Sequence, residues 1–548
     1  MKPRRLILAV SVVAAWFWML GAHVRREYLQ PDLARLADAA LSLSPGIHFY
    51  ALRMGGRTVG EATSSLDTVP GGFVLEDRMV LELPALGQTG TAVARTRVEL
   101  DSALLMKTFE FSLDSEVGRF EAEGEVAGDT LLTVDILSEG SEQEVSFRLP
   151  SPPVFSAVVP IRVALGEGLE VGKSVRLPVF DPSTLSTRNV EVRILEHDTL
   201  VVADSASFSP ATGRWTPATY DSIPAWKMAQ VFGGVSVESW VDEDGRVLQA
   251  SSPLGFAMEK TEYELARQEL ADVGEAGTSA GMDDDVILST AIRSNVDLGE
   301  VEEWDELRFV LSGVDLEGFE LDGGRQELRG DTLIVRREDW SSLEPGYGLP
   351  YPSMDLREAL QPEPLIQSAD PRIIEAAGAA TRGAWWRDDP KAVAGHFTDL
   401  LYRTLEKSVT FSVPSAVQVL EAQQGDCNEH TVLFVALARA LGLPARTAVG
   451  LVYLDGSFFY HAWPEVWLDG DWVAVDPTFG QAPADAGHIR FITGGLAQQV
   501  EIVQLIGRLD IDVVHASERL GTAEAPTSGR VASRWALGAD PAPSPPIP

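Results

Sequence analysis

The stretches GDCNEHTVLFVALARALGLPARTAVG (residues 425–450) and YHAWPEVWLDGDWVAVDPT (residues 460–478) decide the fold of the second half of this chain. The first holds an apolar run that ends at Gly442 and Pro444, residues that stop a helix. We therefore expect a helix that begins at Cys427 and ends just before Gly442. Because this segment is apolar on nearly every side, the helix should lie buried in the centre of a domain.

Cys427 is expected at the first position of this helix. Asp426 can cap the first turn, and Glu429, three residues later, completes a capping-box pattern. Unpaired backbone N–H groups and the positive end of the helix dipole favour a thiolate there, which would lower the pKa of the cysteine. The position therefore predicts a nucleophile.

The second stretch predicts a hairpin with strands at residues 458–468 and 471–479. Asp469-Gly470 joins the strands and suits a two-residue turn. The register that this turn sets pairs Leu468 with Asp471, Trp463 with Asp476, and His461 with Thr478.

His461 and Asp476 then become diagonal neighbours on one face of the hairpin, roughly 7–8 Å apart between backbone positions and within side-chain reach. The opposite face is apolar and can pack on a core, which leaves the His461 face to meet the Cys427 helix. A thiol, an imidazole to share its proton and a carboxylate to orient the imidazole are the groups that nucleophilic catalysis needs. The pattern predicts a Cys427–His461–Asp476 triad.

Cys427 is the only cysteine among 548 residues, so neither an intramolecular disulfide nor a cysteine-based zinc cluster can form. By itself, a cysteine in an apolar helix is more often an inert core thiol, but its combination with His461 and Asp476 favours catalysis. His430, three residues after Cys427, is an alternative base, disfavoured because the hairpin histidine has a carboxylate partner. His488 has no comparable surroundings in the sequence, and we assign it no role.

Through these two stretches the sequence resembles the bacterial transglutaminase-like superfamily of cysteine peptidases and acyltransferases, with all three catalytic positions occupied. The resemblance implies an α+β, papain-like domain at about residues 365–493. It implies that Cys427 attacks an amide carbonyl, that His461 protonates the leaving amine, and that Asp476 orients His461. It implies no metal and no organic cofactor.

The backbone N–H of Cys427 is the natural first donor to the tetrahedral oxygen, because it points outward from the helix start. For a second donor, Gln423 and Gln424 are nearby candidates, although loop glutamines more often face solvent. Trp463 could instead form a wall of the site. The second donor stays unassigned.

We expect a thiol enzyme that acts on amide bonds of proteins or peptides through a thioester, as a peptidase or amidase or as an acyl transferase. The two differ only in which nucleophile reaches the thioester, and hydrolysis is favoured. The alternative is an envelope binding or scaffold protein whose β domains carry the function and whose transglutaminase-like fold is kept for interaction. An intact triad disfavours that alternative.

Residues 1–26 contain three basic residues, then an uncharged and largely apolar run at 6–22, and two arginines. This pattern predicts a single-pass transmembrane signal anchor in the inner membrane, with the bulk of the chain periplasmic. A signal peptide cleaved near Ala22 is the alternative, and it would give the same compartment.

Residues 45–262 alternate apolar and polar side chains, for example at 73–83, and predict an antiparallel β-rich extracytoplasmic domain. It loosely resembles half-barrel domains of bacterial envelope proteins that shelter apolar cargo, although a spacing or docking role is favoured. The remaining segments are expected as a helix and linker (263–285), a small β unit (286–345), a C-terminal strand and helix segment (494–520) and a disordered Pro/Ala-rich tail (521–548).

The composition is that of a globular protein, with 45% hydrophobic and 23% charged residues. A net charge of −37 repels phosphate, so we expect no nucleic-acid partner. Asp283-Asp284-Asp285 lacks the spaced ligands and the glycine of a calcium loop, so we assign no metal there. The expected partners are a protein or peptide substrate and the inner membrane, and the sequence leaves the oligomeric state open.

Overall fold

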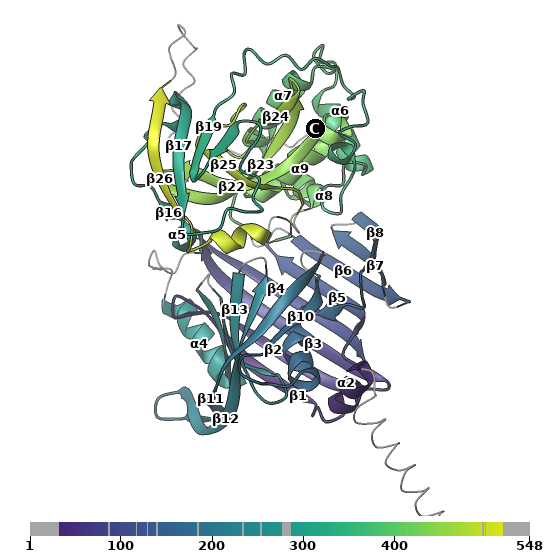
Figure 1. The fold of residues 1–548 in the computed structure, drawn as a ribbon, viewed down its shortest axis with the longest axis vertical. Coiled ribbons are helices and arrows are strands. Elements are labelled where there is room, and N and C mark those ends of the chain that lie inside the picture. The colour runs from purple at the N-terminus through teal and green to yellow at the C-terminus, as the bar shows by residue number, and fades with distance from the viewer. Residues whose placement is uncertain are drawn as a thin grey trace, which may run out of the picture.

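The computed structural model describes residues 32–518, apart from 86–87, 117, 129, 139–140, 183–185, 233–234, 253–254, 277–285, 411, 414, 496–497 and 499. The predicted membrane segment at 1–26, the acidic turn at 283–285 and the tail at 521–548 lie outside the described residues. Among the residues described, no helix combines the length and the apolar character needed to cross a membrane. The chain forms a β-rich lobe followed by a mixed α/β lobe (Figure 1).

The β-rich lobe is one sheet of 15 strands in the order β8-β7-β6-β5-β4-β3-β2-β1-β15-β14-β13-β12-β11-β10-β9. Neighbouring strands pair antiparallel, as predicted, except β9 with β10. The strands are β1 (Gly46–Met54), β2 (Arg57–Val69), β3 (Gly72–Ala85), β4 (Gln88–Asp101), β5 (Met106–Ser115), β6 (Gly118–Ala127), β7 (Leu131–Ser138), β8 (Ser141–Arg148), β9 (Val154–Phe155), β10 (Ser174–Asp181), β11 (Ser186–Ser209), β12 (Arg214–Phe232), β13 (Val235–Val241), β14 (Val247–Ser251) and β15 (Phe256–Thr261).

The sheet curls until its two ends share a core. The rings of Phe109 on β5 and Phe180 on β10 lie 5.2 Å apart between centroids, although these strands belong to opposite ends of the sheet. Helix α3 (Val159–Gly166) adds Ile161 to the same core. Helices α2 (Asp32–Ala40) and α4 (Tyr263–Ala276) pack against α3 and against β1 and β2, respectively. The lobe thus fills its own interior with side chains.

A cavity of about 510 Å³ lies against strands β2 to β6. Its walls combine charged side chains, such as Glu76, Arg78 and Arg97, with the ring of Phe111.

The mixed lobe contains two larger sheets that face each other. One has the order β16-β23-β22-β25 with β24 paired to β23, and the other has the order β18-β19-β17-β26. Phe309 of β17 contacts Phe458 of β23, with ring centroids 5.7 Å apart, in the core between the sheets. The strands are β16 (Ile292–Arg293), β17 (Trp304–Ser312), β18 (Gln326–Arg329), β19 (Thr332–Arg336), β20 (Glu406–Lys407), β21 (Gln424–Gly425), β22 (Ala445–Leu454), β23 (Ser457–Leu468), β24 (Asp471–Ala474), β25 (His488–Thr493) and β26 (Asp510–Glu518).

The segments at 286–345 and 494–520, expected as separate units, join in one sheet. β17 pairs with β26 along its whole length, from Trp304 opposite Glu518 to Ser312 opposite Asp510. β16 pairs with the first two residues of β23. The small β unit is therefore part of the lobe that carries the candidate site.

Helix α9 (Cys427–Ala440) forms the centre of this lobe, as the sequence predicts. Leu433, Phe434 and Leu437 are fully buried. Three helices surround it, α6 (Pro371–Ala380), α7 (Pro390–Thr404) and α8 (Ala416–Ala422). Short elements complete the described chain: α5 (Val286–Thr290) and the 3₁₀ helices η1 (Ser156–Val158), η3 (Val301–Glu303), η4 (Glu358–Leu360) and η5 (Val500–Leu505).

The hairpin of β23 and β24 follows the predicted register only near its turn. Asp469 and Gly470 both have positive φ, at 54° and 79°, as a two-residue turn needs, and Leu468 lies opposite Asp471. The predicted pairs Trp463–Asp476 and His461–Thr478 are wrong, because β24 ends at Ala474. Pro464 has no N–H to continue the ladder, and Asp476 instead forms a bridge with Gln481.

The apolar face of this hairpin also meets a different partner from the expected one. Val466, Leu468, Val473 and Val475 pack in the same core cluster as the middle of α9. The helix therefore covers the apolar face, and not the His461 face. Only its first residue, Cys427, joins the other core cluster, which includes Ala462.

Candidate active site

The N-terminus of α9 is fixed by its cap. The Asp426 side chain accepts the Asn428 N–H at 2.8 Å, and the Glu429 side chain accepts the Asp426 N–H at 2.9 Å. This is the predicted capping box. Glu429 is buried and also accepts the hydroxyls of Thr410 and Ser412, both at 2.7 Å. Cys427 therefore starts the helix from a rigid frame.

The thiol of Cys427 is half-buried and hydrogen-bonded by the backbone N–H of Ala462, the residue after His461. Burial raises the pKa of Cys427 well above its usual range, and the neighbouring Asp426 charge adds to the rise. The sequence predicted a lowered pKa from the helix dipole alone, so this expectation is reversed. The cysteine rests as a neutral thiol.

His461 and Asp476 form the predicted pair. His461 Nε2 lies 2.7 Å from Asp476 Oδ2, and the two side chains are 5% and 0% exposed. Asp476 Oδ1 accepts the N–H groups of Thr478 at 2.7 Å and Phe479 at 3.2 Å. Burial alone would raise the pKa of Asp476, but His461 and then His488 hold it well below its usual range. Asp476 is an ionised orienting group.

The carboxylate occupies Nε2 of His461, so Nδ1 is the ring nitrogen left for the thiol. Among the described residues, the sulfur of Cys427 accepts a hydrogen bond from the Ala462 N–H. No hydrogen bond joins the sulfur to the His461 ring. Proton transfer therefore requires the ring of His461 to come within hydrogen-bonding distance of the sulfur, and catalytic hydrogen bonds often tighten in this way when substrate binds.

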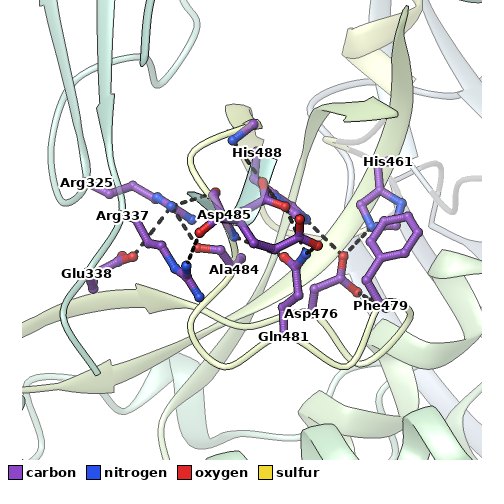
Figure 2. A network of polar contacts seen from close by, with 12 residues as sticks. Arg325, Arg337, Glu338, His461, Asp476, Phe479, Gln481, Ala484, Asp485 and His488 are labelled. Carbon is purple, nitrogen blue, oxygen red and sulfur yellow. Dashed lines mark hydrogen bonds and ion pairs between the residues drawn. The ribbon is translucent and has the colours of Figure 1, made fainter. Parts of the chain in front are cut away.

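His488, to which the sequence gave no role, lies in the same network (Figure 2). His488 Nε2 is 2.9 Å from Asp476 Oδ2, and its Nδ1 is 2.9 Å from Asp485 Oδ1. Burial by itself lowers the pKa of His488, but the two carboxylates raise it to about 9. The only trace in the sequence is an Asp and a His three residues apart, a spacing too common to single out.

The other sequence candidates have structural roles. His430 donates from Nδ1 to the Asp426 carbonyl at 2.7 Å, and burial lowers its pKa to about 4, so it is a neutral helix residue. Trp463 is fully buried and cannot form an open wall. Gln423 follows α8 with a positive φ of 53°, and Gln424 pairs in β21, so the second oxyanion donor stays unassigned.

His461, Asp476 and His488 are also a set that could hold a metal ion, since their ligand atoms lie within 4.8 Å of one another. In a tetrahedral zinc site with metal–ligand bonds of about 2.0 Å, neighbouring ligand atoms lie roughly 3.3 Å from one another. The observed separations of 2.7 and 2.9 Å match direct N–H···O hydrogen bonds better.

Residues 386–477 match the transglutaminase-like superfamily. No curated protein matches the chain. Solved structures that it is similar to include a candidate cysteine protease from Cytophaga hutchinsonii (16% identity, 41% of this chain and 89% of that chain, TM-score 0.24). They also include a β-barrel-like protein of a domain family of unknown function from Brucella abortus (15%, 40% and 95%, 0.28). A third is the periplasmic domain of TgpA from Pseudomonas aeruginosa bound to ethylmercury (18%, 35% and 84%, 0.22).

Proposed function

Because residues 386–477 form a domain of the transglutaminase-like superfamily, we propose that this protein is a thiol enzyme for amide bonds of proteins or peptides. Cys427 is the nucleophile, His461 the base and Asp476 the residue that orients the base. The observation that carries the proposal is the buried hydrogen bond of 2.7 Å between His461 and Asp476, placed next to Ala462, whose N–H contacts the sulfur.

The reaction begins with a neutral thiol, because burial raises the pKa of Cys427. As the sulfur attacks the amide carbonyl, its proton moves to His461 Nδ1, and the imidazolium is stabilised by Asp476 through Nε2–H. His461 then gives the proton to the leaving amine as the C–N bond breaks, which leaves a thioester on Cys427. The Cys427 N–H at the start of α9 supports the oxyanion.

Water or a second amine then resolves the thioester. Attack by water, deprotonated by His461, gives a carboxylic acid and the free thiol; attack by an amine gives a new amide. We favour the peptidase or amidase reaction and retain acyl transfer as the other outcome.

The test uses the full-length protein, a glutamine-containing protein and a labelled primary amine, with Cys427→Ala as the matched control. We expect ammonia or new amino termini to appear with the wild type and to vanish with Cys427→Ala. Incorporation of the label would assign acyl transfer instead of hydrolysis. Equal activity of the wild type and Cys427→Ala would sink the proposal and favour a binding or scaffold protein.

We further propose that residues 1–26 anchor the protein in the inner membrane, with the catalytic lobe in the periplasm. A basic start and an uncharged apolar run support this location. Protease treatment of spheroplasts should digest the catalytic lobe, and carbonate washing should leave the chain in the membrane fraction. Release by carbonate would instead support cleavage near Ala22.

A further inference from the structure

A second histidine–aspartate pair lies behind the proposed triad. His488 is fully buried at the start of β25, between Asp476 on one side and Asp485 on the other (Figure 2). Each ring nitrogen of His488 lies 2.9 Å from a carboxylate oxygen. A neutral imidazole has a single N–H and can donate only once, so two carboxylate partners require the imidazolium.

The two histidines share one oxygen. Asp476 Oδ2 accepts from His461 at 2.7 Å and from His488 at 2.9 Å, while Oδ1 accepts two backbone N–H groups. The positive charge of His488 offsets much of the negative charge of Asp476. A proton that His461 takes from the thiol is then held less strongly than by a lone aspartate–histidine pair.

The facing sheet holds this second pair in place. Arg325, next to β18, donates from Nη2 to the carbonyls of Ala484 at 2.9 Å and Asp485 at 2.7 Å. Gln481 donates to Asp485 Oδ2 at 2.8 Å and is itself bridged to Asp476 through the backbone. Figure 2 shows the resulting chain of contacts from Arg325 to His461. Thus the four-stranded sheet positions the loop that carries Asp485.

We propose that His488, held by Asp485, is a positioning residue that fixes the Asp476 carboxylate and offsets its charge, and that Asp476 in turn holds the ring of His461. This inference rests on the proposed function.

The groups that face His488 from each neighbouring element are few. The carboxylates are Asp476 and Asp485, and the other titratable ring is His461, with a centroid 5.8 Å away. Trp463 and Phe479 cover the remaining sides, at 5.2 and 6.3 Å between centroids. Removing His488 therefore leaves Asp476 with His461 as its one cationic partner among these groups.

The test measures two rates in full-length His488→Gln: cleavage of the amide substrate, and alkylation of the single cysteine by iodoacetamide from pH 6 to pH 9.5. Without the positive charge of His488, the full negative charge of Asp476 should favour a Cys427 thiolate paired with a His461 imidazolium. We expect the ratio of alkylation at pH 6.5 to that at pH 9.5 to rise about tenfold. Amide cleavage should fall about tenfold, because Asp476 is less firmly held.

A purely structural role would lower amide cleavage and leave the alkylation ratio unchanged. A rise in the alkylation ratio together with a fall in amide cleavage therefore identifies positioning. Asp485→Asn should change the alkylation ratio and amide cleavage in the same directions as His488→Gln, by smaller factors. It serves as the test variant if His488→Gln does not fold. His515→Gln, exposed on β26, is the matched control and should change neither rate. An alkylation ratio that stays at the wild-type value in both variants overturns this inference alone, provided that Cys427→Ala is inactive. Activity in Cys427→Ala would remove the proposed function instead.

Discussion

The two lobes of the molecule differ in how deeply their ion pairs are buried. In the β-rich lobe, ion pairs lie across the outer faces of strands, such as Arg97 with Glu76, whose side chains are 41% and 52% exposed. In the mixed lobe, Arg490 and Glu465 lie 3.0 Å apart at 4% and 1% exposure, and His488 and Asp476 are both fully buried. The mixed lobe also has exposed pairs, such as Arg403 with Asp399, but among the described residues the fully buried pairs are found in this lobe.

This difference matters because the two kinds of pair have different energies. An exposed pair is screened by water and contributes at most about 1 kcal/mol. A buried pair loses its hydration and is stable only while each partner remains in place, so that removal of one partner costs about 3–5 kcal/mol. We infer that the mixed lobe uses its buried charges to hold geometry, and the β-rich lobe uses its charges for solubility and strand pairing.

The largest effect should come from Asp476→Asn. The amide leaves the shape of the site almost unchanged but removes the charge that stabilises His461 during attack, so amide cleavage should fall about 10³–10⁴-fold. Asp114→Asn, which breaks exposed pairs with Arg95 and Arg119, is the matched change in the β-rich lobe and should leave activity within about twofold. Steady-state rates on one substrate compare the two. Similar losses in both variants would erase the contrast between the lobes.

The next effect concerns stability. Glu465→Gln leaves the buried Arg490 guanidinium without its carboxylate, and should lower the free energy of unfolding of the mixed lobe by about 3 kcal/mol. Glu76→Gln in the β-rich lobe should cost less than about 0.5 kcal/mol. Urea denaturation followed by tryptophan fluorescence measures both. A Glu465→Gln midpoint equal to that of Glu76→Gln would contradict the assignment.

The mixed lobe should also lose stability in alkali. The pKa of His488 is raised from 6.5 to about 9 in the fold, so its contribution is fully present below pH 6.5 and is lost as pH rises through 9. Between pH 7 and pH 9.5 the loss should be about 2 kcal/mol. His488→Gln should flatten this part of the pH profile in urea denaturation. A variant with the wild-type slope would show that another group titrates.

The smallest effect is a gain in the β-rich lobe. Asp77 on β3 has an unpartnered, buried Oδ1, and burial raises its pKa to about 6. Such a carboxylate destabilises the fold increasingly as the pH rises from 3.8 to about 6, because the unfolded chain ionises more easily, and the full destabilisation persists above pH 6. Asp77→Asn should therefore add about 1 kcal/mol at pH 7 and nothing below pH 4, whereas Asp67→Asn, exposed on β2, should be neutral. Destabilisation by Asp77→Asn at pH 7 would show that its charge is compensated.

Local sequence signals predicted the parts of the candidate site well. The capping box of Asp426 and Glu429 depends on residues three apart, and the Asp469-Gly470 turn on two adjacent residues. These interactions are short in sequence, so residue types alone specify them. The pairing of His461 with Asp476 was also predicted, although through a register that Pro464 interrupts.

Non-local features were missed. Asp485 and His488 are only three residues apart, but their support by Arg325 joins segments separated by 160 residues, and nothing in the sequence indicates that these segments meet. The raised pKa of Cys427 also escaped prediction, because burial outweighs the helix dipole and burial depends on what packs around the helix.

The sequence by itself determined the buried helix with Cys427 at its start, the hairpin turn and the residue types of the proposed triad. Tertiary structure alone decided that the four-stranded sheet joins the catalytic lobe, that α9 covers the apolar face of the hairpin, and that His488 stands between two aspartates. The physical reason is that helix caps and turns are satisfied within a few residues, whereas the charge state of a buried group depends on the partners that the whole fold brings to it.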